Sequence, residues 1–595
     1  MVYSLQKILW KIFPPGSGGE LFLRTLYHHL TAGKLYNAWL ARRARASYPR
    51  WLKAQEEWLQ SAGRPAEGAP GLTFLLPVAA GKGELAAATV RTILAQRSRN
   101  WNLLLAGGQG EPGLQSLLGG IAGDERVHIQ PGEGGSLPDL VSGCRTEYFA
   151  CCLPGDEFSR FFVESFRQAA LAEPASVVIF TDSDLRTGLR GRPVPHFKPE
   201  AYSPGLHLST NYLSRAAILK SAAAGLAPGL DAGLEFGVQE WALLLGLCSR
   251  PARITHIPRV LVHQYAPGPF AAAGVEKMLS AHLAGLGLRS PEVKMAAAGP
   301  TCRWSTARPP VSIIIPTRNK LALLKTLLDS IFQLTDYPRY EVVLVDNAST
   351  DPAVGAYYRE LLETRNLRVI PFEGPFNYSR AVNLGAAHAA GELYLFLNND
   401  MRVLAPDWLD RLVQWALLPG VGVAGAKLLH PGGTIQHAGL VMGMKDFVGH
   451  LYLNAPDHYH GLLGSADWYR EVSAVTGACQ MVRREVFAEI GGYDEAFELV
   501  FSDIHFCLQA LKKGYRVVYT PDTVLVHFEG ASRGYTTPVR DILRGFEVLQ
   551  DWMERDDPYF SPNLTCTQIP ACRFDPHHLE RRLEQVRQRK EAYTR

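Results

Sequence analysis

The sequence predicts an α/β protein made of two tandem domains, each built around a mostly parallel β-sheet. In the first half, apolar runs at Leu72–Val78 and Trp101–Ala106 enclose a stretch of helical periodicity at Val90–Gln96. In both halves a strand ends in proline, Pro77 or Pro316, and a helix and a second strand follow within about 30 residues, as in a βαβ unit. The two halves therefore indicate an internal duplication.

The second half repeats the alternation more clearly than the first. Its short, continuously apolar runs are typical of strands that are buried on both faces of a parallel sheet. The expected strands are Val311–Ile315, Glu341–Val345, Arg368–Ile370 and Leu393–Leu397, and the expected helices are Ala322–Phe332 and Ala381–Ala390. The expected division of the chain is a basic helical N-terminal extension (1–70), a first α/β domain (71–285), a Pro- and Ala-rich linker (286–310), a second α/β domain (311–540) and a helical C-terminal extension (541–595).

Composition excludes several classes of protein. The chain has 595 residues, of which 47% are hydrophobic and 20% charged, so it buries cores and is neither disordered nor fibrous. A net charge of +4 over this length does not suggest a nucleic-acid binder. The nine cysteines contain no CxxC pair, which argues against a zinc cluster and a disulfide framework.

The N-terminal extension is more basic than the rest of the chain. Within residues 1–50, Glu20 is the one acid, and the cations are Lys7, Lys11, Lys34, Arg24, Arg42, Arg43, Arg45 and Arg50. Packing of these helices on the domain behind them is one interpretation, and contact with an anionic membrane surface is the other. Because no run of about 18 apolar residues occurs, we expect a cytoplasmic protein, peripheral at the inner face of the membrane.

Polar side chains follow three strands of the second half, at residues 316–319, 346–351 and 398–400. Ligands of open α/β sheets bind beyond the carboxyl ends of the strands. A turn or helix cap explains any single Asp or Asn in such a place. Three clusters at successive strand ends instead predict a binding site.

Five segments carry a resemblance to a known family. In chain order they are VSIIIPTRNK, VLVDNASTD, FNYSRAVNLGAAHAAGELYLFLNND, TGACQMVRREVFAEIGGYDEAF and VFSDIHFCLQALKKGYRVVYTPDTVLVHFEGASRG. Together they resemble a family-2 glycosyltransferase with the GT-A fold, a Rossmann-like nucleotide-diphospho-sugar transferase fold, over about residues 309–540. The resemblance implies two tandem GT-A domains, with the second one catalytic.

The resemblance assigns donor-binding residues. It implies that Asp346 holds the nucleotide base, and that the remaining nucleotide and donor contacts come from Pro316, Thr317, Asn319, Asn383, Asn399 and Arg533. For Arg533, which could contact the diphosphate as a fixed cation, an ordinary surface position is the alternative.

The resemblance also implies a divalent metal ion, Mn²⁺ or Mg²⁺. The segment 398–400 takes the place of the family's DxD motif, so Asp400 supplies a carboxylate ligand, and His527 matches the family's C-terminal histidine. Asn398 stands where the family has its first Asp, which removes one negative charge. A structural histidine is the alternative for His527.

Asp503 matches the family's general base, which takes the proton from the acceptor hydroxyl. A helix-capping Asp is the alternative. The sugar and acceptor pocket is expected at Trp468, Thr476 and Gly477, with core packing as the alternative for Trp468.

The first half resembles the same family but has lost its functional positions. Ala106, Gly107 and Gly108 replace the nucleotide carboxylate, Leu153 and Gly155 fall on the metal motif, and the base segment reads Gln239, Glu240, Trp241. We expect a degenerate domain that scaffolds the active one or holds the glycan acceptor. A functional role for Asp182, Asp184 or Glu240 is the less favoured interpretation.

The expected activity is that of an inverting, metal-dependent hexosyl- or rhamnosyl-type glycosyltransferase. Its partners would be a UDP-, dTDP- or GDP-sugar donor and a cell-surface polysaccharide acceptor, such as an O-antigen, capsule or lipid-linked glycan. A non-catalytic glycan-binding or scaffold protein is the alternative. A nucleotidyltransferase is disfavoured because PTRNK is not a Gly-rich phosphate loop.

Overall fold

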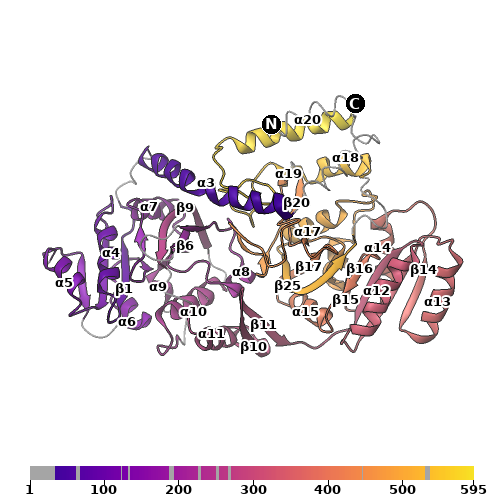
Figure 1. Ribbon diagram of the computed structural model, residues 1–595, viewed down its shortest axis with the longest axis horizontal. Helices are drawn as coiled ribbons and strands as arrows, with labels where there is room; N and C mark the ends of the chain where they lie inside the picture. Colours follow the sequence, from indigo (N-terminus) through magenta and orange to yellow (C-terminus); the bar gives the residue numbers. More distant parts are fainter. Residues whose placement is uncertain are drawn as a thin grey trace.

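The protein is elongated, with one α/β domain at each end and the N- and C-terminal extensions along one side (Figure 1). The computed structural model describes residues 34–61, 68–121, 123–130, 135–186, 193–224, 230–249, 253–265, 270–444, 447–528 and 537–594. Within these ranges, none of the helices combines the length and the apolar character that a membrane span requires.

The first domain surrounds a mixed sheet. Among the described residues its strand order is β3-β2-β1-β4-β8-β6-β9-β5, and β7 pairs with β6. Its strands are β1 (Leu72–Val78), β2 (Trp101–Gly107), β3 (Val127–Gln130), β4 (Tyr148–Cys151), β5 (Glu157–Phe158), β6 (Ser176–Arg186), β7 (Val194–His196), β8 (Ala217–Lys220) and β9 (Arg253–Tyr265). Its helices are α4 (Gly83–Leu94), α5 (Pro112–Gly119), α6 (Leu137–Ser142), α7 (Phe162–Ala172), α8 (Pro204–Ser209), α9 (Ser221–Ala224), α10 (Phe236–Cys248) and α11 (Ala272–Gly285).

The second domain contains a larger sheet of the same kind. Its order over the described residues is β14-β13-β12-β15-β24-β17-β25-β16, with β18 on β17 and β23 on β25. The strands are β12 (Val311–Thr317), β13 (Tyr340–Asp346), β14 (Leu367–Pro371), β15 (Leu393–Leu397), β16 (Met401–Val403), β17 (Val421–Leu429), β18 (Ile435–His437), β23 (Arg470–Glu471), β24 (Cys479–Arg483) and β25 (Arg516–His527). The helices are α12 (Leu321–Leu334), α13 (Pro352–Thr364), α14 (Tyr378–His388), α15 (Trp408–Ala416), α16 (Arg484–Ile490) and α17 (Ser502–Lys512).

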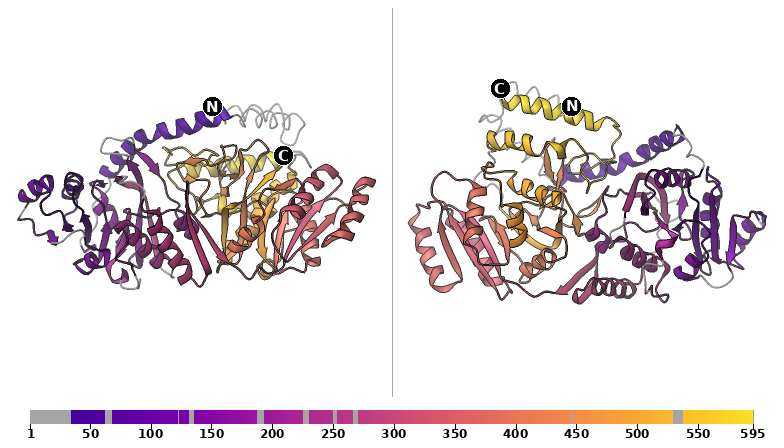
Figure 2. Two further views of the ribbon diagram at one scale, coloured as in Figure 1. Left: turned by 60° about the horizontal axis from the view of Figure 1, so that its bottom comes forward. Right: turned by 180° about the vertical axis from the view of Figure 1, so that it is seen from behind.

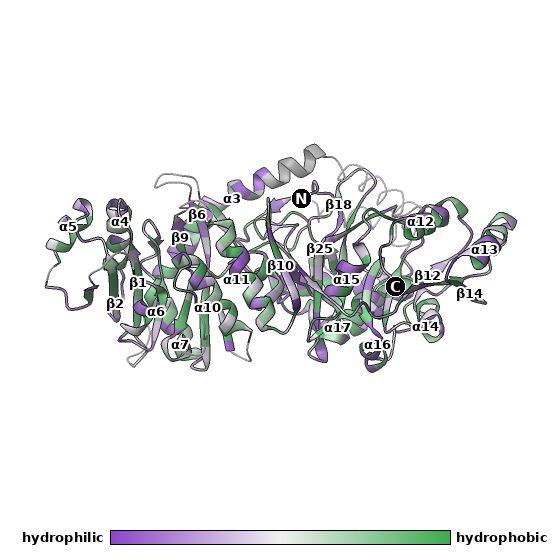
Figure 3. Cartoon of the chain, turned by 90° about the horizontal axis from the view of Figure 1, so that it is seen from below, coloured by the Kyte–Doolittle hydropathy of each residue, from purple (hydrophilic) through white to green (hydrophobic). Residues whose placement is uncertain are grey.

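The two sheets follow one plan, which confirms the predicted duplication. β1 pairs with β2 and β4 as β12 pairs with β13 and β15, starting at Leu72 and Val311 respectively. The central strands are apolar (Figure 3), and every residue of β12 is buried, as expected for a sheet covered on both faces. The fold class is therefore two tandem GT-A-like α/β domains, and the register gives residue equivalences between them.

The segment 286–310 corrects the expectation of an irregular linker. It contains an antiparallel hairpin of β10 (Arg289–Ala296) and β11 (Gly299–Ser305), which lies between the domains in Figure 1. In β11, Cys302 and Trp304 are buried with an exposed residue between them. This alternation of burial is typical of a strand with one face on a core, and the Pro- and Ala-rich composition concealed it.

The N-terminal extension packs on the first domain. The described part is one helix, α3 (Lys34–Ser61), and Pro49 lies inside it. Trp51 stacks edge-on against Phe197 at 5.0 Å between ring centroids, and Gln55 exchanges two hydrogen bonds with the backbone of Val260. Figure 2 shows α3 running across the top of this domain. The packing interpretation of this helix is confirmed.

Truncation of Trp51 should destabilise the protein. The side chain is 6% exposed, so Trp51→Ala is expected to cost about 3–5 kcal/mol of unfolding free energy. Trp58 lies on the same helix but is 52% exposed, with Arg259 over its ring, so Trp58→Ala should cost about 1 kcal/mol or less. Urea unfolding of both variants measures the difference. Equal losses would contradict the docking of α3 through its Trp51 face.

The C-terminal extension covers the second domain. It comprises α18 (Val539–Val548), α19 (Gln550–Met553), a loop and α20 (His578–Thr594), in line with the expected helical extension. Asp541 of α18 is fully buried and accepts hydrogen bonds from the amides of Glu498, Leu499 and Val500 at 2.7–2.8 Å. This carboxylate fixes the loop that leads into α17.

Candidate functional site

A carboxylate and a hydroxyl stand side by side where β12 and β13 end. Thr317 and Asp346 are paired residues of these strands. The Asp346 side chain accepts hydrogen bonds from the Ser349 hydroxyl at 2.5 Å, the Ser349 amide at 3.0 Å and the Tyr358 hydroxyl at 2.9 Å. The carboxylate is therefore held in one orientation at the carboxyl edge of the sheet.

Asn319 braces the same edge. Its backbone is left-handed, with φ at 52°, and its side-chain oxygen accepts the amides of Thr350 and Asp351 at 2.8 and 3.1 Å. Pro316 is paired with Val345 in the strand ladder. These residues shape the predicted nucleotide pocket, and Asn319 does so by joining the loop after β12 to the loop after β13.

The segment 398–400 reaches this edge from β15. Asn399 donates from its side-chain amide to the Thr317 hydroxyl at 3.2 Å. Asp400 is buried, and one of its carboxylate oxygens lies 3.2 Å from Nε2 of His527. The backbone reinforces the pair, because the Phe528 amide donates to the Asp400 carbonyl at 2.9 Å and Met401 is paired with His527.

The Asp400–His527 pair fits a divalent ion of the Mn²⁺ or Mg²⁺ class. A carboxylate oxygen and an imidazole nitrogen are suitable donors for Mn²⁺ in particular. Asp457, His458 and Asp467 form another cluster of ligand-type groups, within 4.8 Å of one another. The ammonium of Lys427 contacts both of its carboxylates, at 2.7 Å from Asp467, and so offsets one of their two negative charges. The Asp400–His527 pair is thus the better metal candidate.

Asp503 lies in the first turn of α17, beside Gly477. One carboxylate oxygen accepts the Gly477 amide at 2.7 Å and the other accepts the Ile504 amide at 2.9 Å. The Tyr378 hydroxyl donates to the Gly477 carbonyl at 3.0 Å. A Cβ on residue 477 would lie 3.1 Å from both Tyr378 and Asp503, so the close approach favours glycine.

Sequence reasoning missed some residues around this site. Tyr378 follows the helix cap Asn377, and no strand-end pattern marks it. His437 is buried, with Nδ1 3.0 Å from Nδ1 of His450, and Thr476 lies next to it, with its amide 3.5 Å from Nε2. Burial, with His450 and His527 nearby, lowers the pKa of His437 well below its ordinary value. A neutral imidazole is therefore expected there near pH 7.

Other predicted site residues have structural contacts. The side-chain nitrogen of Asn383 donates to the Tyr493 carbonyl and to the Glu495 carboxylate, and its side-chain oxygen accepts the Tyr493 amide. These bonds fix the loop after α16. Trp468 packs in a core cluster of the first domain and donates to the Ala298 carbonyl at 2.6 Å, as the packing alternative proposed. Arg533 lies outside the described residues.

In the first domain, different residue types stand at the positions that correspond to the proposed site of the second domain. By strand register, Gly107 corresponds to Asp346, and 153–155 correspond to 398–400. Glu240 accepts the Ser214 hydroxyl and the Arg215 amide, each at 2.8 Å. These contacts are structural.

A histidine is retained in both domains. His263 is paired with Glu157 of β5, as His527 is with Met401 of β16. His263 contacts the buried Asp184 carboxylate at 2.8 Å, and the Tyr48 hydroxyl of α3 donates to the same carboxylate at 2.5 Å. In the first domain, α3 therefore packs beside this histidine, through the bond from Tyr48 to Asp184.

Asp182, the neighbouring acid of β6, is also engaged. Its carboxylate lies 3.1 Å from Nε2 of His256 and accepts the side-chain amide of Asn563 at 2.8 Å. Asp182 thus joins the first domain to the C-terminal extension. Its contacts, like those of Asp184, are those of a structural residue.

Residues 312–491 match the family described as Glycosyl transferase family 2. This region is a family-2 glycosyltransferase domain. The match confirms the resemblance drawn from the sequence motifs, and it covers Thr317, Asp346, Asp400 and Gly477. Asp503 and His527 lie beyond its end.

The similarity to two curated relatives extends over both domains of the chain. It is 34% identical to the O-antigen biosynthesis protein RfbC of Myxococcus xanthus over 547 residues, 88% of this chain and 43% of the relative. It is 32% identical to the uncharacterized protein y4gI of Sinorhizobium fredii over 531 residues, 84% of this chain and 58% of the relative. The chain thus spans about half the length of these relatives.

More distant similarities cover less than half of the chain. The O-antigen chain rhamnosyltransferase RfbN of Salmonella typhimurium is 24% identical over 260 residues, 41% of this chain and 75% of the relative. A solved mannosyltransferase of Pyrobaculum calidifontis, in complex with GDP-Man and Mn²⁺, is 23% identical with a TM-score of 0.34, covering 49% of this chain and 74% of its own.

Proposed function

We propose that the second domain is an inverting glycosyltransferase that moves a sugar from a nucleotide-sugar donor to a bacterial surface polysaccharide, such as an O-antigen chain. The observation that carries the proposal is the pairing of Asp400 with His527 and of Asp503 with Gly477 in the same domain as Asp346, a domain whose residues 312–491 match family 2. The relatives named for O-antigen biosynthesis support the acceptor class. The rhamnosyltransferase name of one of them supports a hexosyl or deoxyhexosyl donor.

Each proposed residue has one task. Asp346 and Thr317 bind the nucleoside, and Asp503 takes the proton of the acceptor hydroxyl while that oxygen bonds to the anomeric carbon. The bond from that carbon to the diphosphate breaks on the opposite face, so the configuration inverts. The Gly477 amide keeps one oxygen of Asp503 fixed in orientation.

Asp400 and His527 would hold Mn²⁺ or Mg²⁺. When bound, such an ion neutralises the charge that develops on the departing diphosphate. The remaining finer proposals are a UDP-, dTDP- or GDP-linked donor and a cytoplasmic location at the inner face of the membrane. The exposed Arg42 and Arg43 of α3 support contact with an anionic surface.

The first experiment is donor hydrolysis by the full chain with UDP-, dTDP- and GDP-sugars. One donor should release its nucleoside diphosphate in Mn²⁺ or Mg²⁺, and excess EDTA should reduce release to background because the proposed ligands then hold no ion. Re-addition of the ion should restore turnover. If the folded protein neither binds nor cleaves any donor with metal present, the non-catalytic glycan-binding alternative replaces the proposal.

A further inference from the structure

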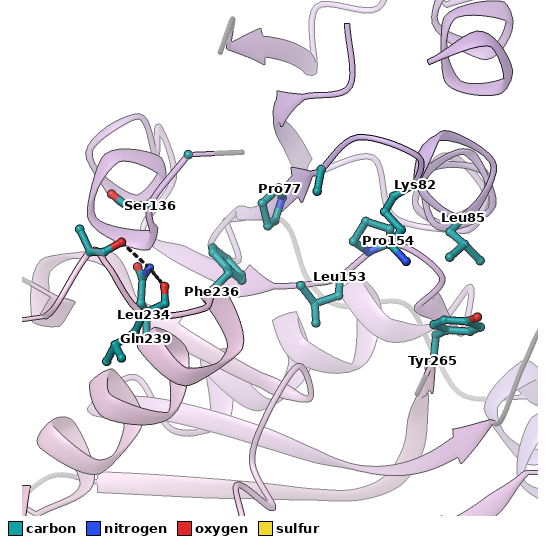
Figure 4. A pocket seen from close by; sticks show the side chains of 13 residues that line it. Pro77, Lys82, Leu85, Ser136, Leu153, Pro154, Leu234, Phe236, Gln239 and Tyr265 are labelled. Atoms are coloured by element: carbon teal, nitrogen blue, oxygen red, sulfur yellow. Dashed lines mark hydrogen bonds between the residues drawn. The ribbon is translucent and has the colours of Figure 1, made fainter. Parts of the chain in front are cut away.

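The first domain retains a cavity at the place that corresponds to the proposed donor site of the second. The cavity measures about 340 Å³, within the range of pockets that hold small ligands. Pro77 near the end of β1, Ala79 just after β1, and Leu153 and Pro154 just after β4 form part of its wall (Figure 4). By strand register, Pro77 corresponds to Pro316, and Leu153 and Pro154 correspond to Asn398 and Asn399.

The chemistry of this first-domain cavity excludes a nucleoside diphosphate with its metal. Leu153, Pro154 and Gly155 replace the segment that contains Asp400, and Gly107 replaces Asp346. The amides of Gly81 and Gly83 at the start of α4 are bound by the Glu111 carboxylate, at 2.7 and 3.0 Å. An incoming diphosphate would therefore meet a carboxylate at the amides that could otherwise bind it.

The lining instead combines apolar surfaces with a few polar groups. Aromatic rings stand at two sides, Phe236 near α10 and Tyr265 at the end of β9, with Leu153 and Pro154 between them (Figure 4). The Tyr265 ring lies over Gly155, where a Cβ would approach it to 2.7 Å and where φ is 100°. Lys82 is the one charged side chain among the described lining residues.

The wall is also pre-organised. Gln239 is buried, its side-chain oxygen accepts the Leu137 amide at 2.8 Å, and its side-chain amide donates to the Leu234 carbonyl at 2.6 Å. Gln239 thus links α10 to α6 and to the loop before α10; Figure 4 shows its contact with Leu234. A rigid cavity loses little entropy when a ligand enters.

We propose that the first-domain cavity is a non-catalytic saccharide-binding site that holds a sugar unit of the acceptor glycan. The apolar faces of a sugar ring match Phe236, Tyr265 and the proline surfaces, and its hydroxyl groups match the ammonium of Lys82. That the sugar belongs to the acceptor glycan rests on the proposed function. Binding of a saccharide in this cavity does not require catalysis by the second domain.

The test is saturation-transfer NMR on the full chain with methyl glycosides of L-rhamnose, D-mannose, D-galactose and N-acetyl-D-glucosamine. EDTA and the omission of nucleotide keep the second domain from contributing donor binding. At least one glycoside should bind, and Ala79→Trp should weaken its binding at least about tenfold by filling the cavity from an exposed position. Ala80→Trp places the same ring on the next exposed residue, outside the lining, and should leave binding unchanged.

Several outcomes overturn the inference. Binding of none of the glycosides by folded protein, or binding that Ala79→Trp does not change, removes the site. Farnesyl phosphate bound in an Ala79-dependent manner, without any glycoside, assigns the cavity to a lipid instead. Donor hydrolysis is measured in parallel: saccharide binding without hydrolysis refutes the proposed function alone, and hydrolysis without saccharide binding refutes this inference alone.

Discussion

Asp503→Asn is expected to lower donor turnover by about 10²- to 10⁴-fold, the usual contribution of general-base catalysis. Asn has nearly the same shape and can still accept the Gly477 hydrogen bond, but it cannot take a proton from the acceptor. Steady-state transfer to a glycan acceptor measures the effect. Nucleotide affinity, measured separately by calorimetry, should remain unchanged because Asp503 does not contribute to the proposed nucleoside contacts.

The matched control for this prediction is Asp410→Asn. Asp410 is a carboxylate of α15 in the same domain, paired on the surface with Arg308 at 3.1 Å. An exposed ion pair contributes about 0–1 kcal/mol, so the folded state and turnover should both survive. If Asp503→Asn retains a tenth or more of the wild-type turnover with an intact fold, the base is another group.

Asp400→Asn is expected to abolish metal-dependent donor binding and with it nearly all turnover. The substitution removes the carboxylate that lies 3.2 Å from His527 and leaves an amide, a poor ligand for a divalent ion. Electron paramagnetic resonance of Mn²⁺ in the presence of the preferred nucleotide measures binding independently of catalysis. The Mn²⁺ affinity should fall at least about a hundredfold.

Asp457→Asn tests the competing cluster. Asp457 contacts the ammonium of Lys427, and Asp467 still pairs with that ammonium after the substitution. Mn²⁺ affinity and turnover should therefore stay at wild-type levels. The reverse result, with loss in Asp457→Asn and retention in Asp400→Asn, would move the metal site to the cluster around Lys427.

Much of the fold could be predicted because buried parallel strands leave a direct record in the sequence. Leu72–Val78 and Leu393–Leu397 are strands with the predicted bounds. The hairpin in 286–310 was missed because its inward residues are few and separated by charged or small residues. Helix α3 continues through Pro49, a residue that ordinarily ends a helix, because the burial of Tyr48 and Trp51 stabilises it.

The candidate site was predictable where its residues follow strands or belong to family motifs. Asp346, Asp400 and His527 are of this kind, and the structure brings Asp400 and His527 together. Tyr378 and Asp541 could not be found in this way. Tyr378 acts through a backbone carbonyl of Gly477, and Asp541 acts through the backbone amides of a loop about forty residues away, so neither contact depends on a side-chain pattern.

The contact between Asn563 and Asp182 has a consequence for the order in which the protein is completed. The two residues are separated by 381 positions, and the Asn563 amide also donates to the Pro258 carbonyl. During synthesis, the first domain leaves the ribosome long before the segment that satisfies Asp182 exists. Until then, the buried carboxylate must rely on His256 and the Lys198 amide. The first domain therefore reaches its final stability only after the second has been made, which couples the assembly of the two halves in time.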